Sequence, residues 1–280
     1  MRNARNARKS NGVFSRVYTL LILMFLYAPM AVMIFFSFNS SNSTAIFEGF
    51  SLHWYEELFK NTAAQQALQN TLILALSAAC ISVVLGTAAA VGIDRIRRRW
   101  MKNLLINVTN LPLMNPEIVT GISMMLLFVF AGRLLRLPNI FGAGSLLIAH
   151  VTFCLPYVIL SVLPKLRQTD PHLAEAAQDL GCSQVRAFFT AVLPVIANGV
   201  VSAFLMAFTI SLDDFVVSNF TSGPSFQTLP LHIYSMTKKR VKPDMYALSS
   251  LIFVAIFLLL LLSNIAQARA ERKQKSTVNK

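Results

Sequence analysis

The chain has 280 residues and a formal net charge of +13, with 25 Lys and Arg against 12 Asp and Glu. Hydrophobic residues make up 55% of the sequence and charged residues only 13%, about half of the charged share of soluble globular proteins. So little charge cannot cover the surface of a water-soluble domain of this length, which excludes that class. Cys80, Cys154 and Cys182 are too few for a disulfide framework. The composition predicts an all-α polytopic membrane protein.

Six segments are long and apolar enough to cross a bilayer, which requires about 20 mostly apolar residues. In chain order they are Val13–Phe38, Leu68–Ile93, Leu104–Ala131, Gly144–Leu163, Val195–Ser218 and Met245–Ala268. Pro112 and Pro116 interrupt the third segment, and lipid cannot satisfy the carbonyl groups that a proline leaves free. We therefore expect an irregular stretch over Asn110–Glu117 that faces protein or water.

The distribution of Lys and Arg predicts the orientation, because these residues accumulate on the cytoplasmic side. Most of them lie in the tails, residues 1–12 and 269–280, in the connection between the second and third segments, and in residues 164–194. Both termini are therefore predicted to be cytoplasmic, which makes residues 39–67 and 219–244 periplasmic loops. The same distribution accounts for the positive charge without nucleic acid.

The sequence lacks the motifs of an enzyme. None of its 11 Gly is followed by Lys, so the P-loop that binds nucleotide phosphates is absent. The four His are too scattered to suggest a metal site. We expect a non-catalytic chain that binds no cofactor or metal, so that any ATP and Mg must be bound by another polypeptide.

Residues 164–194 predict two short helices between the fourth and fifth segments. Asp170 is placed as an N-cap, with Pro171 at the first helical position. The first helix should stop at Gly181 with a positive φ. The second should cover Ser183–Val192 and end before Pro194. The alternative is that this connection is only an amphipathic loop on the membrane surface.

The residues of this connection resemble the EAA loop of ABC importer permeases. The matching positions are Glu175, Ala176, Ala177, Gly181, Leu193 and Pro194, whereas Ala191 stands where the family usually has a larger aliphatic residue. The resemblance implies a type I importer permease fold with six transmembrane helices and a core over residues 68–268. It also implies that the loop docks on an ATPase subunit and couples its closure to the membrane helices.

Other stretches resemble the second permease subunit of spermidine/putrescine importers. They are residues 27–29, 36–41, 54–55, 114–119, 150–156, 211–218 and 222–230. This resemblance implies polyamine import across a bacterial inner membrane. The implied partners are cytoplasmic ATPase subunits, a second homologous permease, a periplasmic binding protein and membrane lipid. An ω-amino acid, another organic amine or ferric ion remains an alternative substrate. A secondary transporter would have no use for an EAA loop.

Acidic residues in membrane segments usually face a cavity or a partner. Glu117, Asp213 and Asp214 are the candidates, and their carboxylates suit the ammonium groups of a polyamine. Trp54 could add a cation–π contact. Each has an alternative: Glu117 could favour a helix N-terminus, the Asp pair could meet basic groups of the partner permease, and Trp54 could contact the binding protein. The substrate-path role is therefore one of two open interpretations for each.

Overall fold

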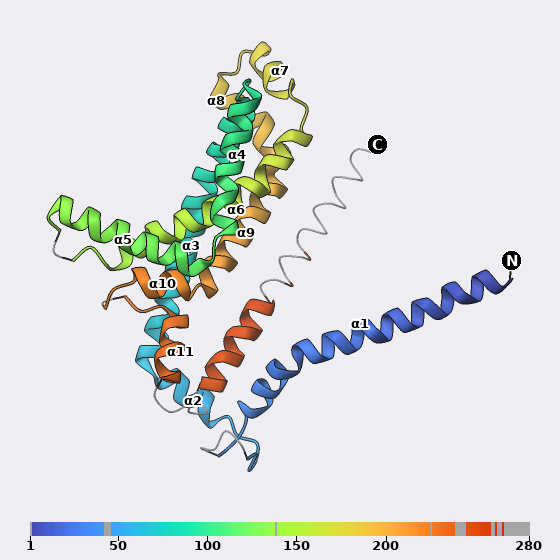
Figure 1. Ribbon diagram of the computed structural model, residues 1–280, viewed down its shortest axis with the longest axis vertical. Coiled ribbons are helices and arrows are strands. Elements are labelled where there is room, and N and C mark those ends of the chain that lie inside the picture. The colour runs from blue at the N-terminus through green and yellow to red at the C-terminus, as the bar shows by residue number, and fades with distance from the viewer. Residues whose placement is uncertain are drawn as a thin grey trace. The chain divides into compact units, whose positions relative to one another are not determined.

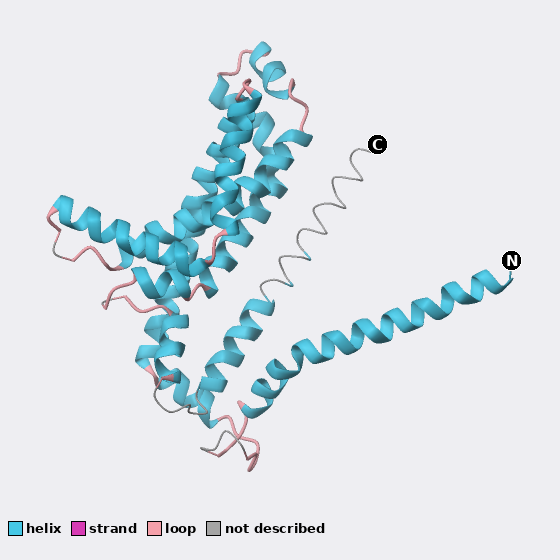
Figure 2. Ribbon diagram, in the orientation of Figure 1, coloured by secondary structure: helices cyan, strands magenta, loops and turns pink. Residues whose placement is uncertain are grey.

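The computed structural model describes residues 2–41, 46–137, 139–224, 226–238, 245–258, 261 and 265. The regular elements among them are helices (Figure 2), which confirms the predicted all-α class. They are α1 (Arg2–Phe36), α2 (His53–Lys60), α3 (Thr62–Arg95), α4 (Arg99–Met114), α5 (Glu117–Leu135), α6 (Ala143–Gln168), α7 (Leu173–Asp179), α8 (Gln184–Ala187), the π-helix η1 (Phe188–Val192), α9 (Leu193–Asp213), α10 (Val216–Thr221) and α11 (Leu229–Thr237). A further apolar helix covers Met245–Leu258.

Five of the described helices are long and apolar enough to cross a membrane. They cover Phe14–Phe36, Thr62–Arg95, Glu117–Leu135, Ala143–Gln168 and Gln184–Asp213. These correspond to the first five predicted segments. Of the sixth, Met245–Ala268, the helix Met245–Leu258 is described and most of the remainder lies outside the described residues. The count of six spans stays a prediction.

The third predicted segment is divided into two helices, so the predicted boundaries were wrong. α4 runs through Pro112 to Met114, and α5 begins at Glu117. The irregular stretch is therefore much shorter than Asn110–Glu117. The reason is local: a proline disfavours the helical conformation in the residue before it, and Asn115 is accordingly extended, with φ −81° and ψ 140°. Pro112 lies inside α4, where it removes one backbone donor and the helix nevertheless continues to Met114.

The chain forms two compact units, which we describe separately. Unit 1 comprises residues 1–62 and 235–257, and unit 2 comprises residues 63–234 and 258–280. In unit 2, α3, α4, α6 and α9 run alongside one another, while α5 crosses their direction and α7 and α8 lie at one end (Figure 1).

The core of unit 2 is built from α3, α6 and α9, with small residues where the helices approach closely. Buried members include Ala79, Ala90, Val158, Ile196 and Ala203. At Gly86 of α3, an added Cβ would lie within 2.8 Å of the Cβ of Val158 in α6, so only glycine fits there. Membrane helices associate through close packing of this kind, because the hydrophobic effect does not drive helix association in lipid.

Unit 1 is organised by polar side chains that follow α1. The Asn39 side chain donates to the carbonyl of Ile46 at 2.7 Å and accepts from the amide of Glu48 at 3.0 Å. The Tyr55 hydroxyl lies 2.7 Å from the Ser37 hydroxyl and 2.9 Å from that of Ser250. These bonds hold the loop after α1 against α2 and the helix Met245–Leu258. The motif formed by residues 36–41 therefore has a structural role.

Candidate functional site

The candidate transport site lies where α9 gives way to α10. α9 ends at Asp213, and Asp214 is extended with ψ 122° before α10 starts at Val216. The predicted fifth segment, Val195–Ser218, therefore ends five residues too late. The carboxylate of Asp214 explains the break: it accepts hydrogen bonds from the amides of Val217 at 3.3 Å and Ser218 at 2.8 Å. These two donors have no partner within α10, so the acid caps the new helix.

A buried polar network fixes this break against α6. His150 of α6 lies with Nδ1 at 2.7 Å from the Ser211 hydroxyl and with Nε2 at 3.0 Å from the Ser218 hydroxyl. Its Nε2 is also 3.5 Å from Oδ2 of Asp214. His150 and Asp214 are 1% and 8% exposed. The network satisfies polar groups that would be costly to bury alone, and it joins three helices.

The second acid of the pair has different surroundings. Asp213 is exposed, and its carboxylate interacts electrostatically with those of Asp214 and Glu117. Glu117 is also exposed and interacts in the same way with Tyr157 of α6. Glu117, Asp213 and Tyr157 come from three regions of the chain and are linked by these electrostatic interactions, and we call this set the acidic cluster.

Close packing joins α5, which carries Glu117, to α10. Glu117 occupies the first position of α5, immediately after Pro116. One turn later, a Cβ added to Gly121 would lie 2.7 Å from Cδ2 of Phe220, so α5 and α10 approach closely. Among the described residues, no Lys or Arg forms an ion pair with Glu117 or Asp213. Two neighbouring carboxylates without a basic partner are stabilised by a cation.

Trp54 lies apart from this cluster in the chain and belongs to unit 1. Its side chain is buried, at 6% exposure, and its Nε1 donates to the carbonyl of Asn39 at 2.7 Å. The indole therefore packs α2 against the loop that follows α1. A contact between Trp54 and substrate stays a prediction.

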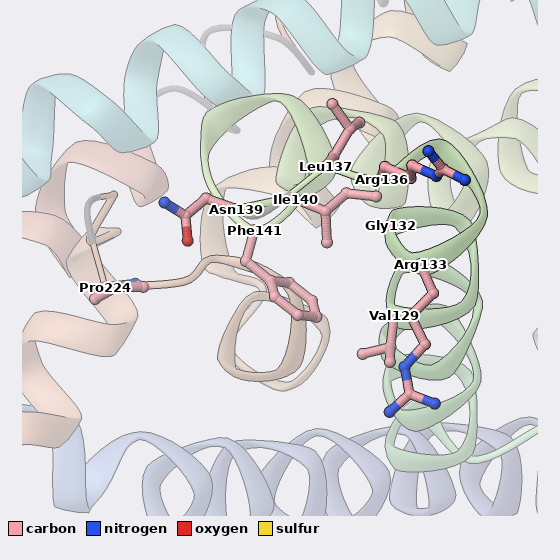
Figure 3. A pocket seen from close by; sticks show the side chains of 9 residues that line it. All are labelled: Val129, Gly132, Arg133, Arg136, Leu137, Asn139, Ile140, Phe141 and Pro224. Carbon is pink, nitrogen blue, oxygen red and sulfur yellow. The ribbon is translucent and has the colours of Figure 1, made fainter.

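A hollow of about 600 Å³ lies at the C-terminal end of α5 (Figure 3). It is lined by Arg133 and Arg136 together with Phe141 and Pro224. The guanidinium groups of the two arginines point in different directions in Figure 3, so they do not converge on one anion. Gly223, at φ 68°, takes a left-handed turn beside Phe141, which accounts for the glycine of the Ser222–Pro224 motif.

Residues 164–194, which we call the coupling loop after the role that the resemblance implies, begin differently from the prediction. α7 starts at Leu173, with His172 in the N-cap position, so Asp170 and Pro171 precede the helix. Oδ1 of Asp170 still accepts a hydrogen bond, from the amide of His172 at 2.9 Å. An aspartate readily forms this turn with the amide two residues further on, and here the turn displaces the helix start.

The end of α7 agrees with the prediction that Gly181 stops the helix. Gly181 has φ +87°. Its amide donates to the carbonyl of Gln178 at 2.8 Å, and the amide of Cys182 donates to that of Ala177 at 3.1 Å. These two bonds form a Schellman motif, which uses a left-handed residue to satisfy the last carbonyls of a helix.

The second short helix does not end before Pro194, so that prediction was wrong. The Ser183 hydroxyl accepts from the amide of Arg186 at 3.4 Å and caps α8, as expected. The chain then continues through η1 into α9, with Pro194 near the start of α9. A proline ring clashes with the carbonyl four residues earlier in an α-helix, and the wider π turn relieves that clash.

The family motif of the loop faces outward. Glu175 and Ala176 are exposed, and so is Leu180, at 88%. Oε2 of Glu175 lies 2.9 Å from Nδ1 of His172, both outside the membrane-spanning helices. The hydrogen bond with Glu175, and then the charges of Glu175 and Asp170, raise the pKa of His172. The loop thus presents a small apolar surface with a polar pair beside it.

Several membrane-spanning helices that carry an outward-facing EAA-type loop define the permease component of a transport system. Residues 82–276 match the family described as "Binding-protein-dependent transport system inner membrane component". Since the match covers more than half of the chain, the chain belongs to this family, which confirms the class and the inner-membrane location predicted above.

Similar proteins indicate which kind of permease this chain resembles. The putrescine transport system permease protein PotI of Escherichia coli K12 is 38% identical over 258 residues, which cover 92% of each chain. The spermidine/putrescine transport system permease protein PotC of Haemophilus influenzae is 38% identical over 248 residues, covering 89% of this chain and 94% of that protein. The predicted resemblance to polyamine permeases is confirmed.

Solved structures show the same fold at low sequence identity. A chain of a bacterial ABC transporter involved in alginate import superposes with a TM-score of 0.72 at 14% identity, covering 96% of this chain and 99% of the other. A chain of an amino acid ABC transporter gives a TM-score of 0.54 at 19% identity, covering 77% and 98%. The fold is that of ABC importer permeases.

Sequence reasoning missed two parts of the site. Tyr157 had no signal, because a tyrosine in an apolar segment is ordinarily a packing residue. The spacing of Ser211, Asp214 and Ser218 suggested no network, since His150 enters it from a different helix. That His150 is buried and hydrogen-bonded is the ordinary state of a histidine inside a helical bundle.

Proposed function

We propose that this chain is a permease subunit of an ATP-driven importer that moves putrescine or spermidine into the cytoplasm. The acidic cluster carries the proposal, because the carboxylates of Glu117 and Asp213 interact electrostatically and have no basic ion-pair partner among the described residues. A polyamine offers several ammonium groups to such a site. The polyamine permeases at 36–38% identity support the same substrate class.

The two acids of the Asp pair have separate roles in this proposal. Asp214 is engaged by His150 and by the first amides of α10, so its charge is already compensated. Asp213 is exposed and unpaired among the described residues, so it remains available to substrate. Both interpretations of Glu117 are compatible with its place, because a carboxylate at the first position of α5 also interacts favourably with the helix dipole.

The energy source in this proposal is a separate ATPase subunit that binds ATP and Mg and docks on the coupling loop. Gly181 and the exposed Glu175 and Ala176 support this assignment, since they form a stiff turn next to a small surface. The remaining partners are a second homologous permease and a periplasmic binding protein. One solved relative of the same fold was determined in complex with a substrate-bound periplasmic protein.

Uptake measurements test the proposal directly. The chain is expressed with its partners in bacteria that lack their own polyamine importers, and entry of labelled putrescine and spermidine is measured. We expect energy-dependent uptake that excess unlabelled polyamine abolishes. If instead the complex imported an ω-amino acid or ferric ion and polyamines had no effect, the proposed substrate would be wrong. The assignment as a permease would remain.

A further inference from the structure

An apolar groove opens on unit 2 where α3 faces the start of the α8–η1–α9 helix. It has a volume of about 530 Å³, within the range of small-molecule sites. Val84, Thr87 and Arg95 line it from α3, and Val185, Phe189 and Leu193 line it from the opposite wall. We call it the α3–η1 groove.

The walls of the groove are suited to hydrocarbon. Val84 is 69% exposed, Val185 67% and Phe189 59%. Because α3 is long and apolar enough to span the membrane, the part of the groove along Val84 lies within the bilayer. Apolar side chains in this position are covered by acyl chains.

A polar atom inside the groove lacks a partner. Thr87 is only 8% exposed, and no described residue hydrogen-bonds its hydroxyl. A threonine in a helix usually satisfies itself by donating to the carbonyl one turn earlier. A buried hydroxyl without a partner is unfavourable, so an occupant of the groove should supply an acceptor.

One end of the groove carries a positive charge that is free to bind an anion. Arg95 is exposed, and no carboxylate among the described residues forms an ion pair with it. The neighbouring Asp94 is instead 2.9 Å from the ammonium group of Lys102. A guanidinium group binds phosphate oxygens in a two-pronged arrangement.

Along α3, the apolar Val83, the hydroxyl of Thr87 and the charge of Arg95 follow one another in the same order as the acyl chain, ester carbonyl and phosphate of a phospholipid. Val83 and Thr87 lie about 18 Å and 12 Å below the Cα of Arg95 along the helix, and the hydrocarbon half of a bilayer is about 15 Å deep. A helical side chain covers the turn before its own Cα, which brings the Arg95 guanidinium closer to Thr87. In a lipid, the phosphate, the ester carbonyl and the acyl chain follow one another in this order toward the bilayer centre.

We propose that the α3–η1 groove binds one glycerophospholipid of the leaflet on the Arg95 side. Its phosphate contacts Arg95, an ester carbonyl accepts the Thr87 hydroxyl proton, and an acyl chain lies along Val84 and Phe189. One wall is the π turn that leads from the coupling loop into α9, so the lipid supports that connection. The proposal depends on the membrane location of α3 and is independent of the transported substrate.

Photolabelling in the assembled transporter tests this site. The complex is placed in nanodiscs that contain phosphatidylglycerol with a diazirine in one acyl chain, irradiated, and digested for mass spectrometry. We expect labels to concentrate on residues 83–95 and 184–193. Arg95→Gln should lower this labelling by about fivefold, as loss of one charge near a lipid surface predicts. Thr87→Val should lower it without changing side-chain volume much, and Val84→Trp should block it.

Arg97→Gln is the matched control. It removes the same charge from the same connection, but Arg97 is exposed and does not line the groove, so labelling should be unchanged. Uniform labelling of all the membrane-spanning helices, unchanged in Arg95→Gln, would overturn the proposal. Cross-linking of the Val84→Cys variant to a partner permease, with no lipid label in the groove, would overturn it as well.

Discussion

The Nε2 atom of His150 lies 3.5 Å from Oδ2 of Asp214, and both side chains are almost fully buried, at 1% and 3% exposure. The contact joins the N-terminal third of α6 to the point where α9 ends. Asp213, one residue earlier, is exposed. Two adjacent aspartates thus have different surroundings, which supports the proposed division between a structural acid, Asp214, and an acid that meets substrate, Asp213.

Replacement of Asp214 should therefore reduce stability. Asp214→Ala removes the acceptor for two amides of α10 and leaves His150 without its carboxylate. Loss of a buried charged hydrogen-bond partner costs about 2–3 kcal/mol. We expect a lower melting midpoint of the purified chain in detergent and lower membrane abundance. Asp213→Ala is the neighbouring control and should leave both unchanged, and equal losses in the two variants would contradict the division of roles.

Neutralising the acidic cluster should reduce uptake and leave folding intact. Glu117→Gln and Asp213→Asn keep the size of each side chain and remove its charge. Because a hydrogen bond to a charged group contributes about 1.5–3 kcal/mol, polyamine uptake should fall by about tenfold or more at limiting substrate. Initial uptake rates, normalised to membrane abundance, provide the measurement.

A matched acid distinguishes this effect from a general loss of charge. Glu56 is exposed on α2 and belongs to unit 1, so Glu56→Gln should transport normally. If Glu117→Gln lowered membrane abundance as much as uptake, the acid would instead serve mainly to stabilise the start of α5.

Local backbone features, such as helix caps and helix stops, could be predicted from the sequence, whereas contacts between distant segments could not. The positive φ of Gly181 and the cap at Ser183 depend on neighbouring residues, and both were predicted. The pairing of His150 with Asp214 depends on how α6 and α9 lie against each other, which no short motif reveals.

Proline shows the limit of local rules. Pro112, Pro116 and Pro194 were each expected to break or end a helix, but only Pro116 does. Pro112 removes only its own backbone hydrogen bond, and α4 continues past it to Met114. At Pro194 a π turn keeps the helix continuous, and such a turn depends on the packing of the segment as well as on its sequence.

The orientation of the chain can be tested with reporters. In unit 2, the end of α3, the end of α6 and the two short helices α7 and α8 lie at one end (Figure 1). The basic residues of these connections predict that this end is cytoplasmic. A reporter that is active only in the cytoplasm should function after Arg99 and at the C-terminus, and be silent after Asn61. The reverse pattern would place the coupling loop outside and refute the predicted topology.

The His172–Glu175 pair should respond to pH. The raised pKa of His172 means that its protonated form is favoured by Glu175, first through the hydrogen bond and then through charge. The support that this pair gives the loop is thus complete below the ordinary pKa of histidine and is lost as pH rises through the raised value. In histidine-labelled transporter in nanodiscs, Glu175→Gln should lower the NMR titration midpoint of His172.

Asp179→Asn provides the control for that titration. Asp179 belongs to the same short helix as Glu175 but is not among the charges that act on His172, so the midpoint should be unaffected. An unchanged midpoint in Glu175→Gln would show that the pair does not form in the assembled transporter.

The strongest prediction concerns Gly181. A Cβ at this position would meet no atom within 4 Å, so substitution acts through the backbone alone, at φ +87°. A β-branched residue held in this conformation costs about 1–3 kcal/mol, and the turn after α7 should change shape. In Gly181→Val the chain should reach the membrane in normal amount, while uptake falls strongly and the ATPase subunit dissociates or hydrolyses ATP without transport. Gly92→Val also adds its Cβ in open space, but at a position without positive φ, so it should transport normally. Full uptake by Gly181→Val with the ATPase bound would show that this loop does not couple the two subunits.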